Sequence, residues 1–271
     1  MSVPRPFRYR RVLPAVLLAL LVPLACSSDS STTATASSAP ASSSGSKASG
    51  PVTVFAAASL TESLNDAQTQ LKTQQPDLSV TYNFAGSGAL VTQIQQGAPA
   101  DVIATADTDS MKKLTDANMV EAPVTFAKNK LEILVQPGNP KHITGLSDLG
   151  RSDIIFVTED DTVPAGKYSA QALSAAGVTV NPVSKEPDVK SAVAKVTSGE
   201  ADATIVYVTD VIAAGSKGEG VVIPDDQNVM ATYPIAIVKT TNNHAGAQAF
   251  VDNIVHGSGQ DALHARGFQP A

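Results

Sequence analysis

The residues with the clearest chemical potential in this sequence lie at four points where a helix is expected to begin. Ser59 follows an apolar run, and Ser87 lies in a Gly-Ser-Gly turn. Pro164 stands in a Val-Pro-Ala-Gly segment, and Asp188 precedes Val189 at a fourth start. The first N–H groups of a helix have no intrahelical partner and carry partial positive charge, so each start is a candidate anion site. Such residues are most often only caps, so the prediction depends on whether several starts converge.

No enzyme motif accompanies these helix starts. The sequence contains no G-x-x-x-x-G-K-[ST], no G-x-G-x-x-G opening a helix and no G-x-S-x-G. The four histidines, at 142, 244, 256 and 264, lack metal-ligand spacing. The acidic run Glu159-Asp160-Asp161 lacks the pattern of a calcium loop and is expected to be a solvated turn. We therefore expect no catalytic residue, no cofactor and no bound metal cation.

The strands and helices that position these residues are predicted from the pattern of apolar residues along the chain. Short apolar runs predict strands at Val52–Ala58, Leu78–Phe84, Asp101–Ala104, Leu131–Val135, Ile154–Val157, Ala203–Val208 and Ile235–Val238. Helices are expected after Ser59, where Glu62 completes a capping box, after Ser87, and at Met111–Ala117, Lys167–Ala176, Val189–Thr197, Ala245–Val255 and Gln260–Arg266. The alternation predicts an α/β fold with parallel sheets, and about 220 residues suit two lobes.

The N-terminus predicts an export signal and a membrane anchor. Val12–Ala25 is an apolar segment of 14 residues after four arginines, which is signal-peptide length and too short to span a bilayer. Cys26, the only cysteine, follows it as in the lipobox of bacterial lipoproteins. Residues 1–25 are then a signal peptide and Cys26 is lipidated. An ordinary signal with a chance cysteine is the alternative, and both general secretory and twin-arginine export stay open.

Residues 26–51 are expected to be a disordered tether. Of the 24 residues Ser27–Gly50, 19 are Ser, Thr or Ala and none is a large hydrophobe. From Ser27 onward the chain has 15 basic and 25 acidic residues, a net charge of -10, which argues against nucleic-acid binding. The part after Cys26 has no thiol, which excludes thiol catalysis, cysteine-ligated zinc and disulfides.

Six short segments carry a resemblance to a known family. They are Thr53–Leu60 (TVFAAASL), Phe84–Leu90 (FAGSGAL), Gly97–Asp107 (GAPADVIATAD), Val163–Gly166 (VPAG), Ile205–Asp210 (IVYVTD) and Tyr233–Val238 (YPIAIV). In this order they are similar to the molybdate-binding proteins of ABC transporters, over residues 52–271. The resemblance implies a two-lobed periplasmic-binding-protein fold of type II, each lobe a mainly parallel sheet flanked by helices, with the ligand in the interlobe cleft.

The resemblance also implies boundaries and a function. Lobe 1 would comprise residues 52–134 and 234–271, and lobe 2 residues 135–233, with crossovers at Leu131–Val135 and after Tyr233. The chain would be a monomer outside the cytoplasm, anchored by lipid to the outer face of the cell membrane. It would capture molybdate, and tungstate as well, and deliver it to the permease of an ABC importer.

The site that the resemblance implies consists of neutral donors around a tetrahedral oxoanion. They are the hydroxyl and backbone N–H of Ser59 and Ser87, the backbone N–H of Ala165 and Val189, and the hydroxyl of Tyr207. Because none is charged, we expect binding to depend little on salt. Gly86 and Gly88 depart from the more serine-rich loop of some relatives and would ease the approach of the backbone to an anion oxygen.

Three alternatives stay open. The first is a receptor for another oxoanion, such as sulfate or phosphate. The second, from a different class, is an enzyme that acts on an anionic substrate in the same cleft, although the sequence offers no nucleophile with its base. The third is a structural or adhesive surface lipoprotein. Calorimetry with several oxoanions discriminates among them.

Overall fold

The computed structural model describes residues 48–271. The predictions for the signal segment 1–25, for Cys26 and for most of the tether 26–51 concern residues outside this range. β1 (Gly50–Ala57) begins two residues before the expected strand, and Ala48 is already buried. Residues 48–271 lie in a single compact unit with its own hydrophobic core.

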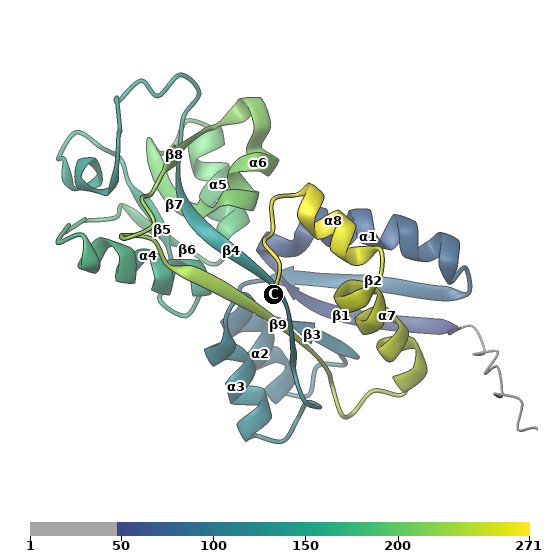
Figure 1. Ribbon diagram of the computed structural model, residues 1–271. Coiled ribbons are helices and arrows are strands. Elements are labelled where there is room, and N and C mark those ends of the chain that lie inside the picture. The colour runs from purple at the N-terminus through teal and green to yellow at the C-terminus, as the bar shows by residue number, and fades with distance from the viewer. Residues whose placement is uncertain (1–47) are drawn as a thin grey trace, which may run out of the picture. The chain divides into compact units, whose positions relative to one another are not determined.

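The first lobe is built on parallel strands. β1 pairs in parallel with β2 (Leu78–Ala85) on one side and β3 (Val102–Ala104) on the other. Five helices cover it: α1 (Thr61–Gln74), α2 (Ser87–Gln95), α3 (Thr108–Asp116), α7 (His244–His256) and α8 (Gly259–Ala265). Alternate residues of β1 face opposite sides, so Val54 packs in the core beneath α1 and α7, whereas Phe55 packs with Leu90 and Leu114 of α2 and α3. Figure 1 shows these two helical layers.

The second lobe has shorter strands. β5 (Val157–Glu159) and β6 (Ser184–Glu186) form a parallel pair, and β7 (Ala203–Tyr207) joins β5 through a parallel bridge between Phe156 and Ala203. β8 (Glu219–Val222) lies at an edge. The helices are α4 (Pro164–Ala175), α5 (Val189–Thr197) and α6 (Val208–Ala214), with short 3-10 turns η2 (Leu146–Gly150) and η3 (Gly215–Lys217).

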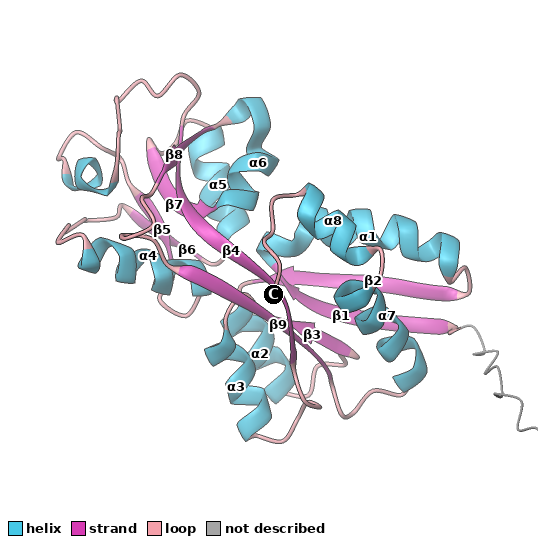
Figure 2. Cartoon of the chain, viewed as in Figure 1, coloured by secondary structure: helices cyan, strands magenta, loops and turns pink. Residues whose placement is uncertain are grey.

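Two long strands connect the lobes. β4 (Val124–Val135) pairs with β9 (Met230–Ile237) through residues 124–130, and with β7 and β8 through residues 131–135. β9 also pairs with β3. These pairings are all antiparallel, since β4 carries the chain out of the first lobe and β9 brings it back. Figure 2 shows both strands running between the two groups of helices.

The predicted α/β fold with two lobes is confirmed, with local differences. The sheets carry antiparallel strands as well as parallel ones, because of these crossovers. The helix at Val189–Thr197 and its N-cap Asp188 are as predicted. The sequence analysis missed β6, β8 and α6, and placed Val208 in a strand although it begins α6.

The capping box predicted for Ser59 and Glu62 does not form. The chain makes a 3-10 turn, η1 (Ala58–Leu60), before α1 begins at Thr61, and this offset takes the Ser59 side chain away from the helix amides. Ser59 Oγ lies 3.0 Å from the hydroxyl of Tyr233 instead, and Glu62 pairs with Lys190. Both side chains are therefore available for contacts beyond their own helix.

Candidate anion-binding site

A small cavity lies where the two lobes meet. The space between the atoms is about 200 Å³ when the open solvent at its mouth is included, and only about 10 Å³ of it is enclosed. Thirteen residues line it, and among them are all five predicted site residues: Ser59, Ser87, Ala165, Val189 and Tyr207. The lobes thus bring together residues that are up to 148 positions apart in the sequence. The five predicted residues therefore lie around one shared space.

Five helical segments, η1, α2, α4, α5 and α6, begin at residues that line this cavity, and the first three lack a side-chain cap. The N-cap residues are Ala57 for η1, Gly86 for α2 and Val163 for α4, and none accepts a hydrogen bond from the first turn. None of the three carries a side-chain acceptor, so their first-turn N–H groups receive no cap from these side chains. Asp188 does cap α5, but its carboxylate accepts only from Ser191 N–H, at the third helical position. The earlier N–H groups are therefore left for a ligand.

Both serine hydroxyls already make a hydrogen bond within the protein. Ser87 Oγ accepts the backbone N–H of Ala106 at 3.1 Å. Burial raises the pKa of Tyr233, which therefore stays protonated and can donate to Ser59 Oγ. A hydroxyl has one proton and two lone pairs, so Ser87 keeps its own proton for an acceptor in the cavity, and Ser59 does so when Tyr233 is the donor. The sequence analysis quoted Tyr233 only in the YPIAIV motif and assigned it no part in the site.

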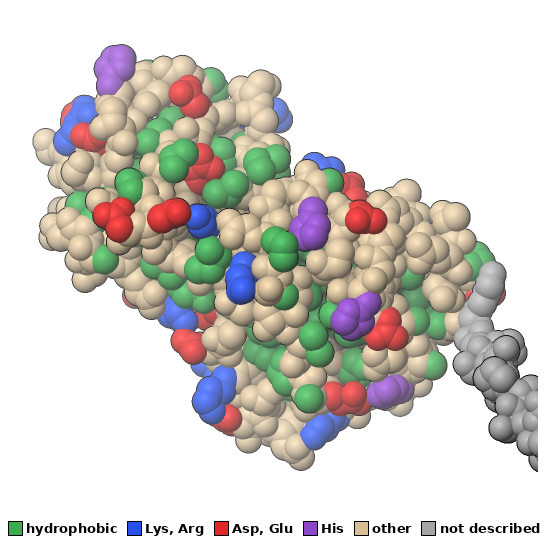
Figure 3. All heavy atoms as spheres, in the orientation of Figure 1, with side chains coloured by type: hydrophobic (Ala, Val, Ile, Leu, Met, Phe, Trp, Pro, Cys, Tyr) green, Lys and Arg blue, Asp and Glu red, His purple; other side chains and the backbone are tan. Residues whose placement is uncertain are grey.

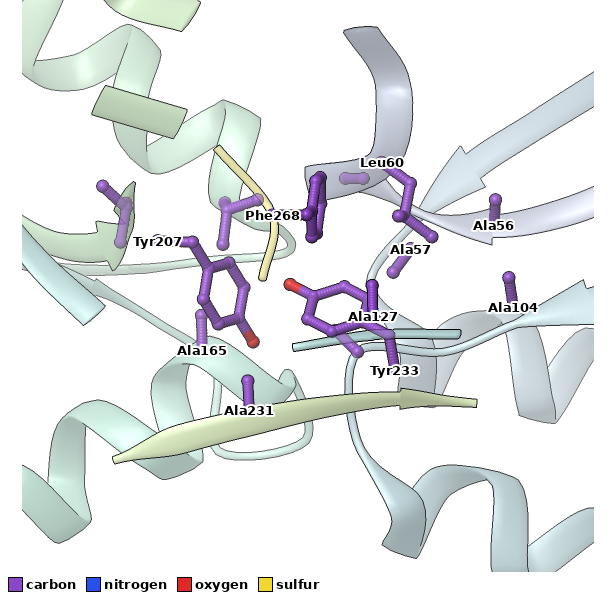
Figure 4. Close-up of a cluster of buried hydrophobic side chains, with 14 of the residues drawn as sticks. Ala56, Ala57, Leu60, Ala104, Ala127, Ala165, Tyr207, Ala231, Tyr233 and Phe268 are labelled. Atoms are coloured by element: carbon purple, nitrogen blue, oxygen red, sulfur yellow. The ribbon is translucent and has the colours of Figure 1, made fainter. Parts of the chain in front are cut away.

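Tyr207 contributes a phenolic hydroxyl that no other described residue satisfies. Its side chain is 1% exposed, and its oxygen has no hydrogen-bond partner among residues 48–271. Its ring packs edge to face on Tyr233 at 5.8 Å between centroids, as Figure 4 shows. Burial raises the pKa of Tyr207 well above its ordinary value, so the group remains a donor. A buried donor without a partner is costly, which argues that a ligand completes it.

The two glycines beside Ser87 permit close approach of the lobes. A Cβ on Gly86 would lie 2.6 Å from the carbonyl oxygen of Pro187, and a Cβ on Gly88 would lie 2.6 Å from that of Thr162. Both carbonyls belong to the second lobe. The predicted reason for these glycines was access to an anion oxygen, whereas the structure places lobe 2 backbone against them. They are required for the lobes to meet around the cavity.

The lining contains no Lys or Arg and one carboxylate, that of Asp188. The described residues contain no cluster of His, Cys, Asp or Glu that could hold a metal ion. Within residues 48–271 no helix is long and apolar enough to cross a membrane. On the face drawn in Figure 3, basic and acidic side chains are interspersed, without a continuous basic stripe. The hydrogen-bond donors that the described lining offers are therefore uncharged.

The sequence of the whole folded part matches a known family. The family described as bacterial extracellular solute-binding protein covers residues 52–269. The chain belongs to this family. As a member of this family, the chain is an extracytoplasmic protein that binds a solute.

The chain is also similar to individual proteins that are named for the anion they bind. The chain is 37% identical over 258 residues to the molybdate-binding protein ModA of Mycobacterium tuberculosis H37Rv, covering 95% of each chain. The periplasmic molybdate-binding protein of Azotobacter vinelandii has the same fold, with a TM-score of 0.70 at 22% identity, over 81% of this chain and 99% of that one. The sulfate-binding protein SubI of M. tuberculosis gives 0.72 at 20% identity, over 82% and 87%. Fold alone therefore does not distinguish the two anions.

One buried acid in this solute-binding chain was wrongly predicted. Glu159 was expected in a solvated turn, but β5 extends to it and carries its side chain into the core, where it is 0% exposed. Neither of its carboxylate oxygens has a hydrogen-bond partner among the described residues. Burial raises the pKa of Glu159 to about 8, and the nearby acids Asp210, Asp188 and Glu186 add to the rise. Glu159 is therefore neutral at pH 7, so it places no negative charge near the Tyr207 hydroxyl.

Glu159 should make stability depend on pH in a defined direction. Its pKa is about 8 in the folded chain and about 4.3 when unfolded, so the folded chain holds the proton more tightly. Stability contributed by this proton is full below about pH 4 and is lost as pH rises to about 8. Replacing Glu159 with Gln should remove this loss. The difference in unfolding free energy between variant and wild type should grow by about 1.4 kcal/mol per pH unit between about pH 5 and 8. Urea denaturation at several pH values measures it, and a difference independent of pH contradicts the assignment.

Proposed function

We propose that this chain captures molybdate, and tungstate equally, outside the cytoplasm and delivers it to an ABC importer. The observation that carries the proposal is the convergence of uncapped helix starts and a partnerless buried tyrosine hydroxyl on one small cavity without cationic side chains. The relatedness to a protein named molybdate-binding, at 37% identity over 95% of this chain, supports the choice of anion.

Seven donors from five residues would surround the anion. They are the hydroxyl and N–H of Ser59 and of Ser87, the N–H of Ala165 and of Val189, and the hydroxyl of Tyr207. Hydrogen bonds to a charged partner contribute roughly 1.5–3 kcal/mol each, so seven exceed the costs of association and lobe closure. Binding then requires no catalysis, and we propose that the chain is not an enzyme.

The acidity of the chain does not oppose this proposal. A net charge of -10 at an average of ~25 Å repels a dianion by roughly 3 kcal/mol in unscreened water. A Debye length of about 8 Å reduces that to a few tenths of a kcal/mol or less. Short hydrogen bonds at helix starts are stronger than this, so the local donors decide the outcome.

Selection among oxoanions would rest on size and protonation. Sulfate has shorter bonds than molybdate, so a closed cavity shaped for the larger anion would hold it loosely. A protonated phosphate needs an acceptor, and the one carboxylate in the lining, Asp188, is engaged as the cap of α5. Tungstate matches molybdate in size and charge.

Calorimetry on residues 45–271 tests the proposal with molybdate, tungstate, sulfate and phosphate. Molybdate and tungstate should bind with dissociation constants within about tenfold of each other, and sulfate and phosphate at least about a hundredfold more weakly. Sulfate binding as tight as molybdate would identify a receptor for another oxoanion. Turnover of an added phosphate or sulfate ester would instead indicate an enzyme. Absence of binding to all four would refute an oxoanion receptor altogether.

The proposal includes the cellular context. Lobe boundaries at 52–134 with 234–271 and at 135–233 would let β4 and β9 act as the hinge, and both lobe rims would face the permease. Lipidation of Cys26 would hold a monomer at the outer face of the cell membrane. Mass spectrometry of the protein from its native membrane tests this: a lipid on Cys26 supports it, and a free or absent Cys26 contradicts it.

A further inference from the structure

Two lysines of the second lobe make ion pairs with carboxylates of the first. Lys190, on α5, lies 2.7 Å from Glu62 of α1. Lys167, on α4, lies 3.1 Å from Asp107 and 2.5 Å from Asp109 at the start of α3. Both lysine side chains are about 70% buried, and Asp107 and Glu62 are mostly buried as well, so these two pairs are screened less than exposed ones, whereas Asp109 is 71% exposed.

Each lysine is attached to the backbone that carries cavity donors. Lys190 follows Val189 directly, and Lys167 is two residues beyond Ala165. On the other side, Glu62 is three residues beyond Ser59. Asp107 follows Ala106, whose N–H holds the hydroxyl of Ser87. The ion pairs therefore join the donor segments of one lobe to those of the other.

Lys190 has a second partner that stays with it when the lobes separate. Asp210 of α6 is fully buried, lies 2.9 Å from Lys190, and accepts the backbone N–H of Tyr207 at 3.3 Å. Desolvation lowers the pKa of Lys190, but Asp210 and Glu62 outweigh it and raise the pKa above its ordinary value. The pair with Asp210 lies within the second lobe and therefore holds Lys190 independently of Glu62.

We propose that Lys190 and Lys167 are positioning residues that hold the lobes closed over the anion through Glu62, Asp107 and Asp109. This inference rests on the proposed function and deepens it. The anion's own donors are neutral, whereas closure depends on charge. The expectation that binding is insensitive to salt is revised accordingly: salt should weaken binding by favouring the open lobes.

The test uses variants that spare the helix caps and the buried Asp210. Glu62→Gln removes one interlobe pair and leaves Lys190 with Asp210, and Lys167→Met removes the other two. Matched controls carry the same charge changes within one lobe: Asp116→Asn breaks the exposed pair with Lys112, and Lys195→Met the exposed pair with Glu200. All are made in residues 45–271, the compact unit.

The rates at which labelled molybdate dissociates and associates show whether these lysines hold the lobes closed or contribute to the initial capture of the anion. Glu62→Gln and Lys167→Met should each speed release by about fivefold to tenfold and leave association within about twofold, since closure follows capture. The double variant should multiply the two effects. The controls should match wild type. Release rates of the interlobe variants equal to those of the controls would overturn the proposal.

Small-angle scattering without any anion separates this inference from the proposed function. The double variant should have a larger radius of gyration than wild type and than the double control, whatever anion the wild type binds. Equal radii of gyration would overturn the proposed role of these ion pairs, even if molybdate binds tightly. Failure of wild type to bind molybdate, with the larger radius present, would instead refute the proposed ligand.

Discussion

Replacing Ser87 with Ala should weaken molybdate binding by about tenfold to a hundredfold, and Ser59→Ala should do the same. Each change removes one hydroxyl donor to a charged acceptor, a contribution of roughly 1.5–3 kcal/mol, while the backbone N–H at the same position remains. Ser87 Oγ accepts from Ala106 N–H and Ser59 Oγ can accept from Tyr233, so both hydroxyl protons can be donated to an anion in the cavity. The double variant should lose at least about a hundredfold. Calorimetry measures all three.

Ser63→Ala is the matched control for the serine variants. Ser63 is equally buried, lies on α1 close to Ser59, and bonds the carbonyl of Leu60 rather than the cavity. The Ser63→Ala variant should bind molybdate with the affinity of the wild type. Thermal unfolding should show that the serine variants remain folded. Wild-type affinity in Ser59→Ala or Ser87→Ala would remove that residue from the proposed site.

Gly86→Val should abolish tight binding without unfolding the chain. Gly86 has φ -62° and ψ 138°, which any residue can adopt, so the first lobe accepts the substitution. The new Cβ would lie 2.6 Å from Pro187 O and 3.2 Å from a methyl of Val163, both in the second lobe. The lobes then cannot close, and the anion loses the donors of Ala165, Val189 and Tyr207. Three lost bonds to a charged group predict a loss of at least about a hundredfold.

Gly145→Val is the matched control for Gly86→Val. It shows whether replacing a glycine with valine has an effect where the lobes do not meet. Gly145 has extended backbone, and a Cβ at this position would meet no atom within 4 Å, so this change should leave affinity and stability near wild type. Scattering on Gly86→Val should show open lobes with molybdate present. An affinity for Gly86→Val within about threefold of wild type would mean that closure at Pro187 is not needed for binding.

The sequence predicted much of the site because its donors sit on local patterns. Pro164 at the first turn of α4 and Asp188 as the cap of α5 follow from local chemistry, and the structure has both. The five residues implied by the resemblance all line the cavity. Whether helix starts converge depends on how β4 and β9 cross between the lobes, and sequence spacing alone does not specify this.

What the sequence did not predict depends on contacts between distant segments. Glu62 looked like half of a capping box, yet it pairs with Lys190, 128 residues away. Tyr233 bonds Ser59 across 174 residues. Glu159 sat in an acidic run typical of a surface, and only the extension of β5 buries it. In each case the position of the side chain depends on contacts or strand pairing beyond its own segment.

A crystal structure of residues 45–271 grown with molybdate, with data at the molybdenum absorption edge, tests the central claim most directly. The account predicts one strong anomalous peak in the cavity, with the oxygens of the anion within hydrogen-bond distance of the hydroxyls of Ser59, Ser87 and Tyr207 and of the backbone N–H groups of Ser59, Ser87, Ala165 and Val189. A peak elsewhere, or an anion in this cavity held by Lys or Arg, would contradict it.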